Sequence, residues 1–240
     1  MNLSVGDLRS CIRKGEGMRL EFKRILPRDE RAARTLCAFA NTRGGLLLVG
    51  ITDRGRVHGV HHPEEVRATL VRIARQWIEP ELTLELQVLE VEGPRVVACS
   101  VPWSKERPHA LLLPTGERQI LIRVGASNRP ADGPTLRGLE VGRPSTRGLT
   151  RFERAVLEWV AAEVRGSPHP GGTATVARFA KSANVSEARA RRSFVRLELQ
   201  GLLLGHGAGR ARIYHPACAR RSVWSGRGVG SRTRTAGVLA

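Results

Sequence analysis

Three acidic residues and one lysine near the start of the chain have the types and spacing needed for metal-dependent chemistry on a phosphodiester. Glu16, Glu21 and Lys23 come first, and Asp53 follows after an apolar segment. Carboxylates that converge on one point repel each other unless a divalent cation neutralises them, and oxygen ligands favour Mg²⁺ or Mn²⁺. Such an ion can activate water, and Lys23 would steady the leaving phosphate. The alternative is that the three acids form ion pairs with nearby arginines, such as Arg19, Arg54 and Arg56.

The elements that must position these residues are short strands. Residues 18–23 alternate between apolar and polar, which predicts a half-buried strand with Glu21 and Lys23 on the same face. Glu16 is separated from Glu21 by an odd number of residues, so the two would point to opposite faces of one strand. Glu16 can therefore approach Glu21 only from a turn ahead of the strand. Asp53 follows residues 46–51, an apolar run typical of a strand buried on both faces.

The rest of the first half predicts alternating helices and strands. Gly44 and Gly45 end one of the helices, where they could form a phosphate cradle or allow close packing. Because this loop follows a helix instead of opening one, the amide geometry that binds phosphate is missing, and packing is favoured. We expect helices at 5–13, 28–41 and 63–78, strands at 82–91, 95–101 and 120–124, and a hairpin at 53–60.

The second half predicts a winged helix-turn-helix. Residues 133–149 are rich in glycine and proline, which is linker composition. Helices are expected at 152–164, 175–183 and 186–200, followed by a two-stranded hairpin between 201 and 214. In this order the third helix would enter the major groove of DNA. The predicted nucleic-acid contacts on this helix and the hairpin are all arginines: Arg189, Arg191, Arg192, Arg196, Arg210 and Arg212.

The charge of the chain predicts an anionic polymer as partner. Lys and Arg total 40 against 22 Asp and Glu, which gives a formal charge of +18. Residues 151–240 hold 16 basic and 5 acidic residues, so the smaller half carries the larger excess. Residues 217–240 contain arginines, glycines and serines without any acid, and they predict a flexible basic tail.

Several classes of protein are not indicated. The four cysteines are scattered and no Cys/His pair has zinc-ligand spacing, so neither a structural zinc nor a disulfide framework is expected. No nucleotide cofactor is expected, because no ATP-binding motif is present. Without a signal pattern or a long apolar run, the sequence predicts a cytoplasmic protein that does not enter membranes.

Four short segments follow one another in a recognisable order: Glu16-x4-Glu21-Phe-Lys23, Ala38-Phe-Ala-Asn-Thr-x-Gly-Gly45, Val49-Gly-Ile-x-Asp53 and Ile122-Arg-Val-Gly-Ala-Ser-Asn128. Together they resemble the Schlafen-type AlbA-like domain over about residues 12–130. The resemblance implies nucleic-acid binding, since bacterial members of the family are described as DNA-binding or transcriptional regulators, often with a C-terminal winged helix.

The resemblance also implies a possible enzyme activity. Animal members of the family include endoribonucleases that cut structured RNA such as tRNA, with two glutamates, an aspartate and a divalent metal. By position in the motifs those acids are Glu16, Glu21 and Asp53. The animal proteins pair two such domains in a horseshoe with a zinc site, whereas this chain has one domain and no zinc-like cluster. A homodimer would rebuild the paired arrangement.

The sequence therefore predicts an α+β protein with an AlbA-like domain at 1–132, a linker at 133–149, a winged helix-turn-helix domain at 150–216 and a disordered basic tail at 217–240. The predicted function is nucleic-acid binding by a bacterial DNA-binding transcriptional regulator, with RNA as a second possible partner. Two alternatives stay open: a divalent-metal-dependent endoribonuclease, and an interaction module that docks on RNA or on a protein.

Overall fold

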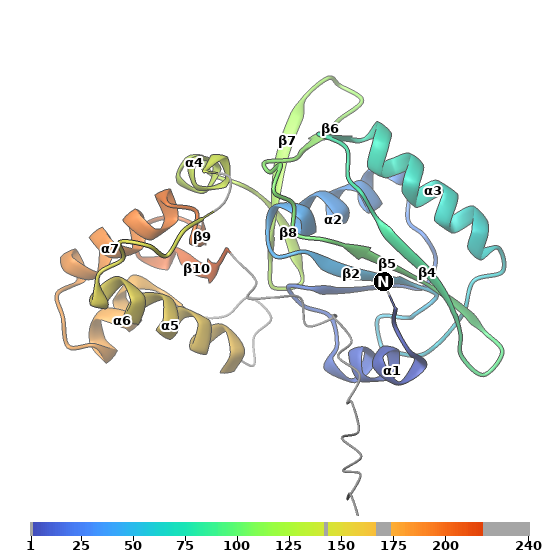
Figure 1. Cartoon of the computed structure of the whole chain (residues 1–240), viewed down its shortest axis with the longest axis horizontal. Helices are drawn as coiled ribbons and strands as arrows, with labels where there is room; N and C mark the ends of the chain where they lie inside the picture. The colour runs from blue at the N-terminus through green and yellow to red at the C-terminus, as the bar shows by residue number, and fades with distance from the viewer. Residues whose placement is uncertain (1, 142–143, 167–173, 218–240) are drawn as a thin grey trace, which may run out of the picture.

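A four-stranded sheet in the order β1-β2-β5-β4 carries the acidic segment (Figure 1). In the computed structural model, which describes residues 2–141, 144–166 and 174–217, β1 runs parallel to β2 and the other neighbours are antiparallel. All residues of β2 are buried, as the continuous apolar run predicts. The four strands are β1 (Leu20–Lys23), β2 (Gly45–Val49), β4 (Glu85–Glu90) and β5 (Arg95–Val101).

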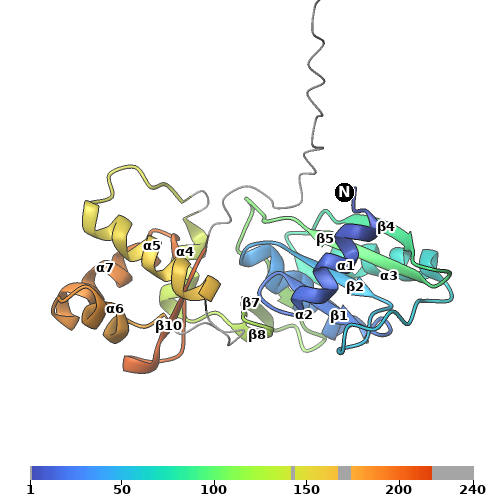
Figure 2. The same ribbon diagram turned by 90° about the horizontal axis from the view of Figure 1, so that it is seen from below.

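Helices cover both faces of this sheet. Leu47 and Cys99 belong to the core cluster that includes the apolar sides of α2 and α3, whereas Leu48 and Ala98 pack with α1 on the opposite face. Figure 2 shows α1 lying across the sheet near β1 and β2. Because alternate residues of each strand meet different helices, the sheet is buried on both sides. The helices are α1 (Val5–Lys14), α2 (Asp29–Asn41) and α3 (Pro63–Gln76).

A second four-stranded sheet packs on the other side of α2. Its order is β3-β6-β7-β8, and all its pairs are antiparallel. Leu111 and Leu121 of this sheet share one core with Leu36 and Phe39 of α2, so the helix lies between the two sheets. The strands are β3 (Ile78–Glu79), β6 (Ala110–Leu112), β7 (Arg118–Val124) and β8 (Ser127–Pro130).

The segment predicted to be a linker contains a helix. Residues Gly133–Glu140 form α4, which begins at the N-cap Asp132, whose side chain accepts a hydrogen bond from the Thr135 amide. Gly138 lies so close to α7 that a side chain there would overlap the carbonyl oxygen of Glu198. The glycine that suggested a linker is therefore needed for close packing between helices, and the linker prediction is wrong for this part of 133–149.

The second half has the predicted order of three helices followed by a two-stranded antiparallel sheet. An aromatic chain runs through its core, with Phe179 and Phe194 at 5.7 Å between ring centroids and Phe194 and Tyr214 at 4.8 Å. Such edge-to-face contacts add to the burial of apolar area. The elements are α5 (Arg151–Gly166), α6 (Val176–Ser182), α7 (Glu187–Leu199), β9 (Leu203–His206) and β10 (Ile213–Pro216).

The structure confirms the predicted α+β class and most long elements, with two kinds of difference. The hairpin predicted at 53–60 is reduced to a single bridge between Ile51 and Val57. The strands β3, β6 and β8 were not predicted. Most of the predicted basic tail, at 218–240, lies outside the described residues. Among the described helices, none is both long and apolar enough to cross a bilayer.

Candidate nucleic-acid interface

Both carboxylate oxygens of Glu21 are engaged by cations. Lys23 Nζ lies 2.6 Å from Glu21 Oε1, which confirms that the two residues share one face of β1. The guanidinium of Arg123, from β7, forms an ion pair with Glu21 Oε2. Only 1% of the Arg123 side chain and 11% of the Glu21 side chain are exposed. The pair joins the two four-stranded sheets, and its cation is not one of the nearby arginines that the sequence suggested.

All three nitrogens of the Arg123 guanidinium have hydrogen-bond partners. Nε donates to the Gly17 carbonyl at 3.1 Å, and Nη1 donates to Asn128 Oδ1 at 2.9 Å. The Asn128 side chain in turn donates to Thr35 Oγ1 of α2 at 3.1 Å. The guanidinium carbon lies 5.1 Å from the Phe39 ring centroid, within the range of a cation–π contact. A buried arginine needs this complete set of partners, because an unsatisfied buried charge is costly.

Asn41 and Thr42 tie the end of α2 to the second sheet. The Asn41 side-chain amide donates to the carbonyls of His109 at 2.8 Å and Leu121 at 2.9 Å, while its Oδ1 accepts from the His109 amide at 2.7 Å. Thr42 Oγ1 accepts from the Arg123 amide at 2.7 Å. Both side chains are fully buried, so these bonds fix how the helix sits on β7.

The two glycines that follow serve packing. Gly44 has a φ of +66°, and a Cβ there would lie 2.7 Å from the carbonyl oxygen of Val101. A Cβ on Gly45 would lie 2.5 Å from the ring of Phe39. Neither position tolerates a side chain, so the predicted packing role of these glycines is confirmed.

The three acids of the predicted metal site have separate environments. Glu16 occupies a turn ahead of β1, as its spacing requires, and its Oε1 accepts a hydrogen bond from the Phe22 amide at 2.8 Å. Asp53 is exposed on the turn after β2. Within the described residues, no three His, Cys, Asp or Glu side chains are grouped so that they could hold a metal. A Mg²⁺ or Mn²⁺ site formed by Glu16, Glu21 and Asp53 stays a prediction.

The solvent-facing side of α7 is cationic. The helix starts at Ser186, whose hydroxyl accepts from the Arg189 amide at 3.3 Å, and its opposite side buries Phe194 and Leu197. Arg191 and Arg192 are exposed, and no hydrogen bond or ion pair within the described part of the chain holds either guanidinium. These two side chains are therefore available to an anionic partner.

Three other predicted contact residues are exposed but partly engaged. Arg196 Nη1 lies 3.3 Å from the buried Glu153 carboxylate, and the guanidinium of Arg189 lies 4.5 Å from the Phe152 ring centroid. The Arg210 side chain is 82% exposed near the tip of the β9–β10 hairpin. Surface contacts of the kind that Arg189 and Arg210 make contribute little to stability, so these two side chains can exchange partners at small cost. Arg196 is more firmly held, because its partner carboxylate is buried.

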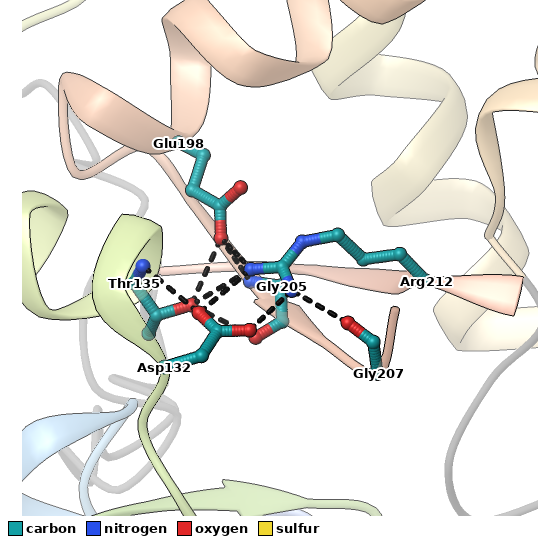
Figure 3. Close-up of polar contacts among 6 residues, drawn as sticks. All are labelled: Asp132, Thr135, Glu198, Gly205, Gly207 and Arg212. Atoms are coloured by element: carbon teal, nitrogen blue, oxygen red, sulfur yellow. Dashed lines mark hydrogen bonds and ion pairs between the residues drawn. The ribbon is translucent and has the colours of Figure 1, made fainter. Parts of the chain in front are cut away.

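Arg212 lies at the centre of a polar cluster that connects three elements (Figure 3). Its Nη2 lies 2.5 Å from Glu198 Oε1 of α7 and 2.9 Å from Asp132 Oδ1, and its Nη1 donates to the Gly207 carbonyl at 2.7 Å. Thr135 Oγ1 of α4 lies 2.8 Å from the same Glu198 oxygen. The side chains of Arg212 and Glu198 are 13% and 1% exposed. The cluster holds the hairpin, the end of α7 and the start of α4 together.

The ion pairs of this cluster shift the pKa values of its members. The hydrogen bond to Asp132 has the largest effect on the pKa of Arg212 and raises it; burial acts in the opposite direction, but the bond to Glu198 adds to the increase, so the pKa is raised. Burial alone would raise the pKa of Asp132, but hydrogen bonds from Arg212 and the Thr135 amide outweigh it and lower that pKa. Because the guanidinium is committed to these carboxylates, the prediction that Arg212 contacts nucleic acid is replaced by a structural role.

Comparison with known proteins identifies the first half of the chain. Residues 16–132 match the family model described as Schlafen, AlbA_2. This part of the chain belongs to the Schlafen AlbA_2 family. Two solved structures are similar to parts of the chain. The N-terminal domain of a RecG-related protein from Nitrosomonas europaea has 28% identity and a TM-score of 0.43, covering 54% of this chain and 93% of that one. The DIP2311 protein from Corynebacterium diphtheriae has 19% identity and a TM-score of 0.41, covering 68% of this chain and 34% of that one.

The AlbA_2 assignment points to a nucleic-acid-related function, in agreement with the formal charge of +18. In this AlbA_2 domain, residues that carry the resemblance also hold the fold together. Glu21, Asn41, Arg123 and Asn128 all belong to the hydrogen-bond network between α2 and the two sheets.

Sequence reasoning missed the residues that join the AlbA_2 domain to the second half. Asp132, Thr135 and Glu198 surround Arg212, yet Thr135 lies 63 residues from Glu198 in the chain, and Arg212 lies 80 residues from Asp132. The one local signal was Asp132 followed three residues later by Thr135, the spacing of a helix N-cap. That signal was available but was outweighed by the glycines and prolines around it.

Proposed function

We propose that the protein is a DNA-binding regulator that inserts α7 into the major groove of duplex DNA. The observation that carries the proposal is the pair of unengaged guanidinium groups, Arg191 and Arg192, on the exposed side of α7. Guanidinium groups suit bidentate contacts with phosphates and with the O6 and N7 acceptors of guanine.

The arrangement around α7 supports this use. Helix α6 ends at Ser182 and α7 begins at Glu187, so residues 183–186 form a turn of the length found in helix-turn-helix motifs. Asn184 has a φ of +50°, the left-handed conformation that lets the chain reverse there. The hairpin β9–β10 follows the helix directly, which is the order of a winged helix-turn-helix, with the exposed Arg210 near its tip as a contact to the DNA backbone.

The AlbA_2 domain adds a second argument for a nucleic-acid partner, since it belongs to a nucleic-acid-related family. Arg212 and its carboxylates attach the α7 end of the second half to α4, which begins directly after the AlbA_2 domain. A ligand bound on α7 would therefore be held in a defined orientation to that domain. Regulation of transcription follows from this proposal if the bound site overlaps a promoter.

The experiment is a titration of duplex DNA against the wild type and an Arg191→Ala/Arg192→Ala variant at several salt concentrations. The wild type should lose affinity steeply with salt, because each neutralised phosphate releases counterions. The variant should bind about 10- to 100-fold more weakly at moderate salt, and its slope of log K against log salt should fall by about 2.

A matched control is Arg67→Ala/Arg72→Ala, which removes the same charge from α3 of the AlbA_2 domain. These two side chains are 40% and 44% exposed and pair with Glu64 and Asp29. The control should keep the wild-type affinity within about threefold, since its charges lie outside the proposed interface. Equal weakening by both double variants, or an affinity that does not change with salt, would refute the proposal.

A further inference from the structure

The exposed side of α7 carries apolar side chains between its arginines. Val195 and Leu199 are 40% and 39% exposed, and they lie one helical turn apart. They line a groove of about 440 Å³. The groove is lined by Arg191, Arg192, Val195, Arg196, Leu199 and Gln200.

This pair needs an explanation because the fold does not require it. The apolar residues that α7 contributes to the core, Ala190, Phe194 and Leu197, are completely buried on the other side of the helix. In the described part of the chain only four large apolar side chains are exposed, and two of them are Val195 and Leu199. Because Val195 and Leu199 lie on the same surface as the arginines and line one groove with them, a ligand on that surface would contact both.

The rim of the groove restricts what can fill it. Three of its residues are arginines and none is acidic. A second copy of this chain would bring three more guanidinium groups against these three, which disfavours a symmetric dimer through this face. The occupant must be anionic and must also present small apolar groups.

Duplex DNA meets both requirements. Its major groove is bordered by phosphates, and each thymine projects a C5-methyl group into it. RNA lacks this methyl group, and the major groove of an A-form helix is too deep and narrow for an α-helix. Resting on the proposed function, we infer that Val195 and Leu199 recognise thymine methyl groups, so that the protein selects DNA over RNA and thymine over uracil.

The spacing along the helix sets the expected pattern. Residues four apart rise by about 6 Å along a helix axis, and successive base pairs are about 3.4 Å apart along the duplex. Val195 and Leu199 would therefore contact thymines about two base pairs apart. Arg191 and Arg192, at the start of this face, would contact guanines or phosphates on the adjoining base pairs.

The test uses two versions of the same DNA. A pool of random-sequence duplexes is enriched for binding by the full chain, and the selected duplexes are then copied with thymidine or with deoxyuridine. The wild type should bind the thymine version about fourfold more tightly for each methyl group in contact, or about 16-fold for two. Equal affinity for the two versions would overturn the inference while leaving the proposed DNA binding intact, whereas no binding to either would overturn both.

A Val195→Ala/Leu199→Ala variant tests whether these two side chains recognise the thymine methyl groups. Both positions are exposed and alanine favours helix, so the melting temperature should change little. The variant should bind the thymine and uracil versions equally, with the wild-type affinity for the uracil version. Ile25→Ala, which removes another exposed apolar side chain far along the chain from α7, should keep the discrimination. If the double variant still bound the thymine version more tightly than the uracil version, the inference would be overturned. It would also be overturned if the wild type proved to be a dimer and the double variant a monomer, because Val195 and Leu199 would then form a contact between two copies of the chain.

Discussion

Arg212 and Glu198 form an ion pair, with 2.5 Å between Nη2 and Oε1, in which the carboxylate is completely buried. We predict that Arg212→Ala lowers the free energy of unfolding by about 3–5 kcal/mol, because the change leaves a buried carboxylate without its cation. Urea denaturation at neutral pH measures this loss.

Arg210→Ala is the matched control for that change. This arginine is two residues away and its side chain is 82% exposed, 3.5 Å from Glu187. Its loss should cost less than about 1 kcal/mol. Equal destabilisation by the two variants would show that the cluster around Arg212 does not hold the hairpin in place.

Glu21→Ala should also destabilise the protein by about 3–5 kcal/mol, because Arg123 would remain buried without a counter-charge. The comparison variant is Glu64→Ala, which breaks an exposed ion pair with Arg67 and should cost less than about 1 kcal/mol. Thermal unfolding of the three proteins side by side measures the difference. A Glu21→Ala protein as stable as the wild type would contradict the structural role of this glutamate.

The predicted nuclease activity is best tested at Asp53. A loss of activity in Glu21→Ala could not be separated from a loss of folding, whereas Asp53 is exposed and its change to Asn should leave stability within about 0.5 kcal/mol. Structured RNA and duplex DNA are incubated with wild type and variant in the presence of Mn²⁺ or EDTA. If the acids hold a metal, we expect Mn²⁺-dependent cleavage that Asp53→Asn abolishes. If the variant still cleaves, or if the wild type does not cleave, the prediction of a metal site is wrong.

His215 should make stability depend on pH. It is buried, and neither ring nitrogen has a hydrogen-bond partner in the described part of the chain. Burial first, and then the charges of Arg43 and His206, lower the pKa of His215 from 6.5 to about 4. The unfolded chain therefore takes up a proton at higher pH than the folded protein does. The contribution of the neutral His215 to the free energy of unfolding should be fully present above about pH 6.5. It should decrease by on the order of 3 kcal/mol as the pH drops to about 4.

His215→Leu removes this titration without breaking a hydrogen bond. Its stability should fall less steeply than that of the wild type between pH 6.5 and 4, as measured by urea denaturation across the pH range. His62→Leu serves as comparison, because the His62 side chain is 74% exposed. Parallel pH curves for wild type and His215→Leu would contradict the assignment.

The parts of the fold that could be predicted from sequence have local patterns. The apolar run of β2 and the helical spacing in α2 and α3 depend on neighbours within a few residues, and these elements were found where expected. Strand β8, Ser127–Pro130, has no apolar alternation, and only its pairing with β7 makes it a strand. Periodicity carries no information about such a strand.

The candidate site was predictable only in part for a similar reason. The odd spacing of Glu16 and Glu21 correctly placed Glu16 in a turn, because that argument depends on strand geometry alone. The partner of Glu21, by contrast, is 102 residues away along the chain, and several closer arginines were equally plausible. Which cation reaches a buried carboxylate is decided by how the two sheets pack on α2.

The close approach of α4 to the end of α7 decides how the protein can be divided. A Cβ on Gly138 would overlap the carbonyl oxygen of Glu198, and a Cβ on Gly201 would overlap the carbonyl oxygen of Gly138. A piece beginning at residue 150 would omit Asp132, Thr135 and Gly138, and would expose the Glu198 carboxylate together with the apolar Leu204. The smallest fragment that keeps α7 and the hairpin folded should therefore start ahead of Asp132, at the last strand of the AlbA_2 domain. Recombination or engineering that exchanges the second half between proteins would have to carry helix α4 along with it.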